Sequence, residues 1–305
     1  PMTKTYLALG FFIIYKLLTG NAYGNTQLKR SFAQKDQTFH NIGSYENGKK
    51  VAEVSHLSTT IKKKRNQWTR NKTKNNWSIM LGGLGAVKPK YKGSSQHEIS
   101  GYPFIDIKYK RILFLNFREG LGINILHAPN FRVGAAFNFY GSRNEDDSTY
   151  LQGFQDLEAG LEAGVFCFIS SGNFSTRLQF RKDISDNHEG YLFYGRFIYK
   201  AVESRKLMVN LNIKTTYASD SYIKTYFGVT TSQASASGLK AFNANGGIKD
   251  VGAGTNLIYP FDKYWSLIAI TNYTRLLNDA ANSPLVENVG SKNQFWLGLG
   301  VAYRF

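Results

Sequence analysis

The sequence predicts an all-β protein: a transmembrane, antiparallel, up-and-down β-barrel of twelve strands, with ten strands as the alternative. The clearest sign is the segment 295–305, which places Phe, Leu, Leu, Val, Tyr and Phe at alternate positions and mostly Gly, Ala or Arg between them. Side chains of a strand alternate between its two faces, so one face here is large and apolar and the other small or charged. Such a strand suits a wall with lipid outside and a crowded lumen inside.

Composition and repetition point the same way. The chain holds 19 Tyr and 22 Phe in 305 residues, yet its mean hydropathy is only −0.32, so the aromatic excess comes without long apolar runs. Outer-membrane barrels combine these features, because aromatic girdles flank a wall of alternating strands. Trp77 and Trp265 are the predicted girdle residues. A single cysteine, Cys167, excludes an internal disulfide and a metal site built on paired cysteines.

Alternating segments of roughly ten residues recur from Trp77 onward, joined in turn by short and long connections. The expected strands are 77–87, 100–109, 112–118, 121–126, 131–140, 161–169, 174–181, 191–201, 207–217, 248–261, 265–276 and 295–305. The hairpin 112–126 and the strands that begin at 191 and 265 alternate poorly, which keeps ten strands as the alternative. An even number of strands places both termini of the barrel chain on the periplasmic side.

The N-terminal quarter differs in composition from the rest. Residues 1–24 read as a signal peptide, with Lys4 before an apolar run and small residues at 22–24. Residues 25–76 carry twelve Lys and Arg against three Asp and Glu, much of the net charge of +17, among polar residues without periodicity. Disorder is therefore expected there. An exported basic segment would meet anionic lipid, acidic wall material or an acidic protein rather than nucleic acid, or would serve as a solvated tether.

Charged residues within the strands fall on the parity opposite the large apolar side chains. An Arg or Lys facing lipid near the middle of the bilayer costs ~2–4 kcal/mol, so these residues are expected to face the lumen. The predicted lumen-facing set is Asp106, Arg132, Glu162, Arg177, Arg181, Arg196, Lys214 and Arg304. Both signs are present, so the set could pair across the lumen and close it, or line a narrow polar path.

The second half of the chain closely resembles the MipA/OmpV family of outer-membrane proteins. The strings that carry the resemblance are 225–229, 233–234, 237–239, 247–252, 275–280, 283–287, 290–294 and 300–305, and further upstream 91–94 and 153–156 also resemble loops of the family. Several lie in expected loops, which barrel architecture alone would not dictate, whereas the segment 25–76 is not part of the pattern. Tyr303 and Phe305 match the aromatic C-terminal signal for barrel assembly.

The resemblance implies an outer-membrane barrel of a Gram-negative bacterium. It also implies a scaffold that binds a membrane-bound lytic transglycosylase and a bifunctional penicillin-binding protein, joining peptidoglycan cleavage to synthesis. Other members of the family imply antigens or proteins that affect uptake, so a narrow pore for polar solutes and a surface adhesin built on 219–247 and 278–292 stay open as alternatives. Lipid of the outer membrane is the expected surrounding, and the oligomeric state stays open.

Enzymatic readings find little support in the residues. His188 has Asp183, Asp186 and Glu189 beside it, but no distinctive serine string that would supply a nucleophile. The glycine strings 82–85 and 298–300 lack the following helix and lysine of a nucleotide loop, and close packing in the lumen explains them better. The sequence therefore predicts no enzyme, no cofactor and no metal site.

Overall fold

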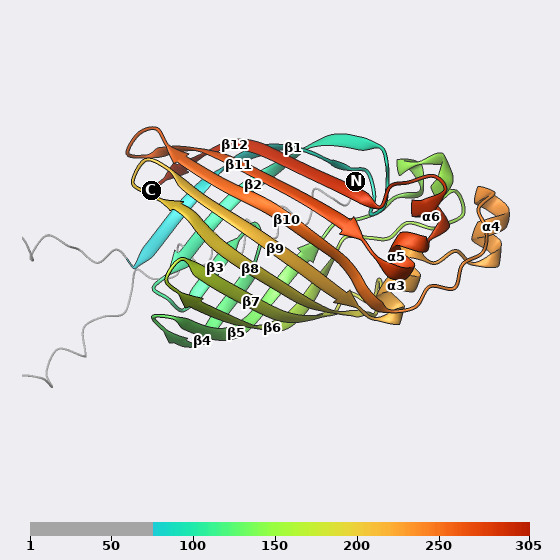
Figure 1. Cartoon of the computed structure of the whole chain (residues 1–305), viewed down its shortest axis with the longest axis horizontal. Helices are drawn as coiled ribbons and strands as arrows, with labels where there is room; N and C mark the ends of the chain where they lie inside the picture. Colours follow the sequence, from blue (N-terminus) through green and yellow to red (C-terminus); the bar gives the residue numbers. More distant parts are fainter. Residues whose placement is uncertain (1–75) are drawn as a thin grey trace, which may run out of the picture. The chain divides into compact units, whose positions relative to one another are not determined.

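Residues 76–305 are the part of the chain that the computed structural model describes, and they form a closed antiparallel barrel (Figure 1). Its strands are β1 (Trp77–Pro89), β2 (His97–Tyr109), β3 (Leu113–Asn116), β4 (Gly120–Ala128), β5 (Phe131–Tyr140), β6 (Gly160–Ser171), β7 (Phe174–Asp183), β8 (Tyr191–Glu203), β9 (Met208–Ala218), β10 (Gly247–Pro260), β11 (Trp265–Leu276) and β12 (Asn293–Arg304). Each strand pairs with the next, and β1 pairs with β12. The twelve-stranded up-and-down barrel is thus confirmed over this part of the chain, and the ten-stranded alternative is wrong. The predicted signal peptide and all of the basic segment except Asn76 lie outside the described residues.

The barrel wall has an apolar outer face. In β12, Leu297, Leu299 and Val301 are exposed, whereas Ala302 on the other parity is fully buried. Residues paired across two strands share a face, so the register carries this parity around the wall. The outer row includes Phe137, Val165, Leu178, Phe193, Ile213 and Val251, all of them exposed. A belt of exposed apolar side chains around a closed sheet is the surface that lipid covers.

Several glycines of the wall lie where a side chain would collide with the backbone of a neighbouring strand, and two of them illustrate this. A Cβ atom on Gly300 of β12 would lie 2.0 Å from the backbone oxygen of Gly83 on β1. On Gly164 of β6 it would lie 1.9 Å from the backbone oxygen of Phe180 on β7. Both positions therefore exclude any side chain, in agreement with the interpretation of strand glycines as points of close approach.

The hairpin of β3 and β4 is the irregular part of the wall. β3 has only four residues, and the turn 117–119 follows it directly. Phe117 of this turn contacts two inward side chains, with ring centres 5.6 Å from Tyr102 on β2 and 6.3 Å from Trp296 on β12. The turn therefore folds into the lumen instead of continuing up the wall.

A notch in the wall lies above this short hairpin. In the described part of the chain, residues 106–109 of β2 pair with both β1 and β3. Residues 97–104 of β2 pair with β1 alone. Ile99 pairs with Val87, which in turn pairs with the lipid-facing Leu297, so the unpaired edge reaches membrane depth. Pro103 lies on this edge, where it has no N–H group to leave unsatisfied. Backbone N–H and C=O groups without strand partners are tolerated at membrane depth only where they line a cavity or meet water or protein.

A cap of short helices covers the end of the barrel opposite the C-terminus (Figure 1). Its elements are the 3-10 turns η1 (Glu145–Asp147) and η2 (Thr149–Leu151) and the helices α3 (Asp220–Phe227), α4 (Thr231–Ser237), α5 (Asn278–Asn282) and α6 (Pro284–Glu287). Two clusters of buried apolar residues hold them together, one around Tyr222, Phe227 and Val286, the other around Leu151, Phe154 and Leu285. None of the helices among the described residues has the length and apolarity to cross a bilayer.

Candidate functional site

In the structure, all eight charged residues predicted to face the lumen lie at the inward-facing positions of their strands. They form three groups. Glu162 and Arg181 lie near the capped end. Asp106 and Arg304 lie near the other end, where both are partners of Met80 in the β1 register. The third group is the remaining four, which the pairing of β5 to β9 brings into one row: Arg132, Arg177, Arg196 and Lys214, with Phe168 between the first two.

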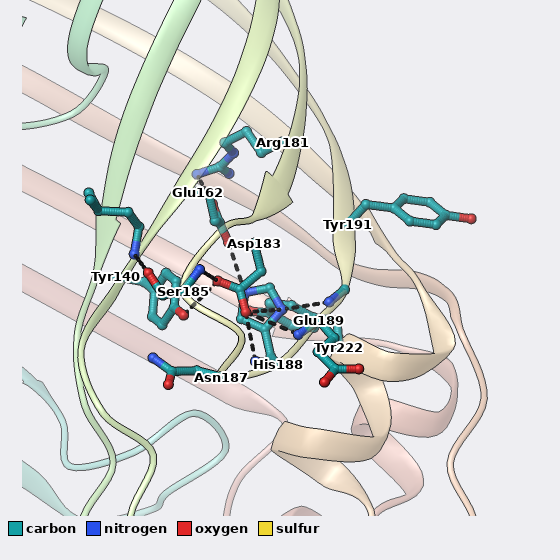
Figure 2. Close-up of polar contacts among 12 residues, drawn as sticks. Tyr140, Glu162, Arg181, Asp183, Ser185, Asn187, His188, Glu189, Tyr191 and Tyr222 are labelled. Carbon is teal, nitrogen blue, oxygen red and sulfur yellow. Dashed lines mark hydrogen bonds and ion pairs between the residues drawn. The ribbon is translucent and has the colours of Figure 1, made fainter.

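At the capped end, Glu162 holds two partners beneath the helices (Figure 2). Its carboxylate lies 3.2 Å from Nη1 of Arg181 and 3.4 Å from Nε2 of His188, and it is almost fully buried. Nδ1 of His188 accepts a hydrogen bond from the backbone N–H of Gly190 at 3.1 Å. Because Nδ1 is an acceptor, the neutral imidazole carries its proton on Nε2, facing the carboxylate.

Asp183, at the end of β7, fixes the loop that carries His188. Its carboxylate accepts hydrogen bonds from the backbone N–H groups of Ser185, His188 and Glu189 at 2.8–3.1 Å, and from the hydroxyl of Tyr140 at 2.8 Å (Figure 2). Among the hydrogen bonds of residues 76–305, none joins His188 to a hydroxyl or thiol. The arrangement therefore joins the ends of β6 and β7 to the loop that carries His188. Nδ1 of this histidine accepts a hydrogen bond, and Nε2 faces the Glu162 carboxylate at 3.4 Å.

Lys92, in the loop between β1 and β2, reaches under helix α3. Its ammonium group donates to the hydroxyl of Tyr222 at 2.8 Å and lies 3.4 Å from the ring centre of Tyr226. Burial and the nearby positive charge of Lys249 hold the pKa of Lys92 well below its usual range. Burial likewise raises the pKa values of Tyr222 and Tyr226, so both phenols stay neutral at neutral pH.

This lysine makes the stability of the cap depend on pH. Because the pKa of Lys92 is lower in the folded protein than its ordinary value of 10.5, the unfolded cap binds more protons between those two pKa values. Stability therefore rises with pH across that window, and is lost as pH falls through the folded pKa. We expect resistance of the cap to protease to increase from pH 7 to pH 9.5. The other charged groups facing Lys92 are Glu162, Arg143, Arg181 and Lys249.

The variant Lys92→Met keeps a side chain of similar length without the titrating charge. It should be more resistant than the wild type at pH 7 and should show a flatter pH profile. Lys240→Met, an exposed lysine elsewhere in the cap, is the matched control and should follow the wild type. A Lys92→Met profile as steep as that of the wild type would assign the pH dependence to other groups.

Beside the row of basic residues, the inward turn supplies two charged residues, Arg118 and Glu119, that the sequence analysis did not place in the lumen. Oε2 of Glu119 lies 3.0 Å from Nη1 of Arg177, whose guanidinium also stacks 4.2 Å above the ring of Phe166. The neighbouring Arg118 points into the lumen within electrostatic range of Arg196 on the opposite wall. Its side chain is exposed although it lies inside the barrel, so solvent-accessible space adjoins it. The poor alternation of 112–126 was the only sign of this turn.

The predicted girdle and terminal residues gather at the end with the short turns. Trp77 packs on Tyr109 with ring centres 4.6 Å apart, and Trp265 on Tyr303 at 5.2 Å. The rings of Tyr303 and Phe305 lie 4.9 Å apart, and the N–H of Phe305 donates to the backbone oxygen of Ile79 at 3.1 Å. The last residue is thereby tied into the seam between β12 and β1. Residues 76–305 bring together no group of side chains suited to hold a metal ion.

A closed barrel with an apolar outer belt, a charged interior and aromatic residues at one rim defines an outer-membrane β-barrel protein. Comparison with known proteins agrees and is more specific. The sequence model of the family described as "MltA-interacting protein MipA" matches residues 81–305, and the chain belongs to this family.

Named relatives of the chain are proteins of the outer membrane. It is 30% identical to outer membrane protein Omp26La of Vibrio anguillarum, over 75% of this chain and 86% of that one. It is 30% identical to outer membrane protein OmpV of Vibrio cholerae, over 53% and 61%. It is 27% identical to the MltA-interacting protein of Escherichia coli, over 73% and 88%. The chain is thus an outer-membrane protein, as predicted.

Proposed function

We propose that the chain acts in the outer membrane as a non-enzymatic scaffold for peptidoglycan-remodelling enzymes, a lytic transglycosylase and a penicillin-binding protein. The observation that carries the proposal is its similarity, over 88% of that protein, to a relative named for its interaction with MltA. Nδ1 of His188 accepts from the N–H of Gly190 and Nε2 faces Glu162, and these contacts fit a structural role for the one histidine that sequence reasoning weighed as catalytic.

The docking face would be the end with the short turns, which by the general rule for outer-membrane barrels faces the periplasm. β1 begins at that end. We assign residues 1–24 to a signal peptide that is removed, and residues 25–76 to a basic periplasmic segment. Its positive charge would steer an acidic face of either enzyme toward the membrane.

Affinity capture from detergent-solubilised membranes tests this proposal. We expect the full chain to recover both enzymes, and a chain lacking 25–76 to recover much less of them. Recovery should fall as salt is raised, because the screening length shrinks from about 10 Å at 0.1 M to about 3 Å at 1 M. A matched variant with Gln at 62–65 keeps the length of the segment and removes its densest charge.

Three outcomes are informative. Capture of neither enzyme by the full chain would contradict the scaffold itself. Equal capture by the shortened chain at all salt concentrations would move the docking face to the short turns. Loss of capture on shortening but not with Gln at 62–65 would show that the segment acts through features other than that charge.

A narrow path for polar solutes is the second candidate function. The exposure of Arg118 inside the wall favours it, because its side chain borders solvent-accessible space within the barrel. The cap and the turn 117–119 both stand in this path. Conductance across a planar bilayer, before and after the cap is loosened, tests it.

A further inference from the structure

Four arginines lie near one tyrosine inside the lumen. The guanidinium carbons of Arg196 and Arg181 lie 5.2 Å and 5.4 Å from the ring centre of Tyr194. Arg118 and Arg177 are both within electrostatic range of Tyr194 and of Arg196. They come from three elements, the inward turn, β7 and β8, so the barrel fold and not local sequence brings them together.

The positive charge of this cluster is poorly balanced. Arg177 and Arg196 are direct partners in the register of β7 and β8, and Lys214 is the partner of Arg196 on β9. Like charges placed directly opposite each other destabilise a sheet. The carboxylates that reach the arginines are Glu119, at 3.0 Å from Arg177, and Glu162, at 3.2 Å from Arg181 and shared with His188.

Several donors in the cluster lack a partner within residues 76–305. Arg177 is only 3% exposed, yet neither Nη1 nor Nη2 makes a well-aligned hydrogen bond, despite the short distance from Nη1 to Glu119. Nε of Arg196, Nε of Arg181 and the hydroxyl of Tyr194 are also unpartnered. A buried guanidinium whose donors are only partly satisfied is costly, and a bound anion would offset that cost.

We propose that this cluster, defined by Arg118, Arg177, Arg181, Arg196 and Tyr194, binds a small anion bearing a phosphate or clustered carboxylates. Guanidinium groups pair with both in a two-pronged geometry, and the Tyr194 hydroxyl supplies a further donor. The inference does not depend on the scaffold role. A barrel could dock enzymes at its periplasmic end and still hold an anion in its lumen.

Two sources could supply this chemistry. A free anion would reach the cluster through the solvent-accessible space beside Arg118. The headgroup of an anionic amphiphile would reach it through the notch, because the turn that carries Arg118 forms the base of that opening. Its chain would then lie along the unpaired edge of β2, where Ile99 is 83% exposed.

Isothermal titration calorimetry on the full chain in an uncharged detergent tests the site, with inorganic phosphate in one arm and dihexanoyl phosphatidic acid in the other. Dihexanoyl phosphatidylcholine serves as the lipid control. We expect at least one anionic probe to bind, and Arg177→Gln and Arg196→Gln each to weaken it by about tenfold or more, the usual effect of losing a hydrogen bond to a charged group. Stronger binding of the phosphatidic acid than of phosphate would identify the lipid source, and the reverse the aqueous one.

Two further variants keep the test decisive. Tyr194→Phe removes only a hydroxyl without a partner, so it should fold and weaken binding several-fold. Arg304→Gln removes the same charge from the inward parity at the far end and should bind as the wild type does. Folding of each variant is checked by heat-dependent mobility on gels. Failure of both anions to bind, or equal losses in Arg304→Gln and Arg177→Gln, would overturn the proposal.

Discussion

Replacing Leu299 by arginine should destabilise the barrel by about 2–4 kcal/mol, the usual effect of a cation on the lipid face at the middle of the bilayer. Leu299 lies midway along the outer row of β12 that runs from Phe295 to Tyr303, and it is 54% exposed. Its register partners are Gly85 and Ala269, which offer no group to pair with a guanidinium. Reversible unfolding by denaturant in lipid vesicles measures the effect.

The control is a second arginine substitution, placed near the surface of the membrane instead of at its middle. Phe261 is exposed just beyond the end of β10, beside the short turn to β11, where an outward cation meets headgroups. Phe261→Arg should therefore cost only about 0–1 kcal/mol. If the two arginines cost the same, the outer row of β12 would not face the hydrocarbon, and the assignment of inside and outside would have to be reversed or abandoned.

The alternation of β5 and β12 was enough to predict which face of the wall meets lipid. That signal is strong because a shift of one residue would move every side chain of a strand to the other face. The alternation of apolar and polar side chains is weaker in 112–126 for a physical reason. The turn 117–119 leaves the wall and points inward, and the register shifts on β4 between Asn124 and Leu126, so neither stretch keeps the two-residue period.

The helices of the cap were missed, although a signal for one of them was present. In α3 the buried residues Tyr222, Ile223, Tyr226 and Phe227 recur at helical spacing, and Ser219 caps the helix by accepting from the N–H of Tyr222. Eight residues make a weak pattern, and the helix depends on packing against α5 and α6 from a loop some fifty residues later. Such long-range packing leaves no trace in local sequence.

The sequence indicated on which face of the wall the charged residues lie, but not which of them contact one another. Parity alone put Arg177 and Arg196 on one inner face, whereas the pairing of Arg177 with Glu119 depends on how short β3 is. Composition does not determine the length of a strand. Lys92 and Arg118 were overlooked for a similar reason, since both lie in connections that fold back into the barrel. Loops that turn inward are therefore where sequence reasoning about a barrel fails first.

Phe227→Ala should loosen the cap while the barrel stays folded. Phe227 is fully buried, and its backbone oxygen accepts from the hydroxyl of Ser283 at 2.6 Å, which ties α3 to the start of α6. Truncating a buried Phe to Ala typically costs about 3–5 kcal/mol. Small clusters outside the main fold open locally at less than the global free energy of unfolding, so this loss falls on the cap. Faster proteolysis at 219–247 with unchanged heat-dependent mobility is the expected result, and Tyr150→Ala, exposed in the cap, is the control.

The conductance of Phe227→Ala distinguishes two barriers to a polar path, the cap and the turn 117–119. If the cap is the barrier to a polar path, Phe227→Ala should conduct in a planar bilayer where the wild type does not. If the turn 117–119 also closes the lumen, conductance will stay low although the cap is cut, and only a second change in the turn will raise it. Glu119→Gln suits that purpose, because it releases the ion pair that holds the turn to Arg177. A double variant that still fails to conduct would exclude the path and leave the lumen as a closed, charged interior.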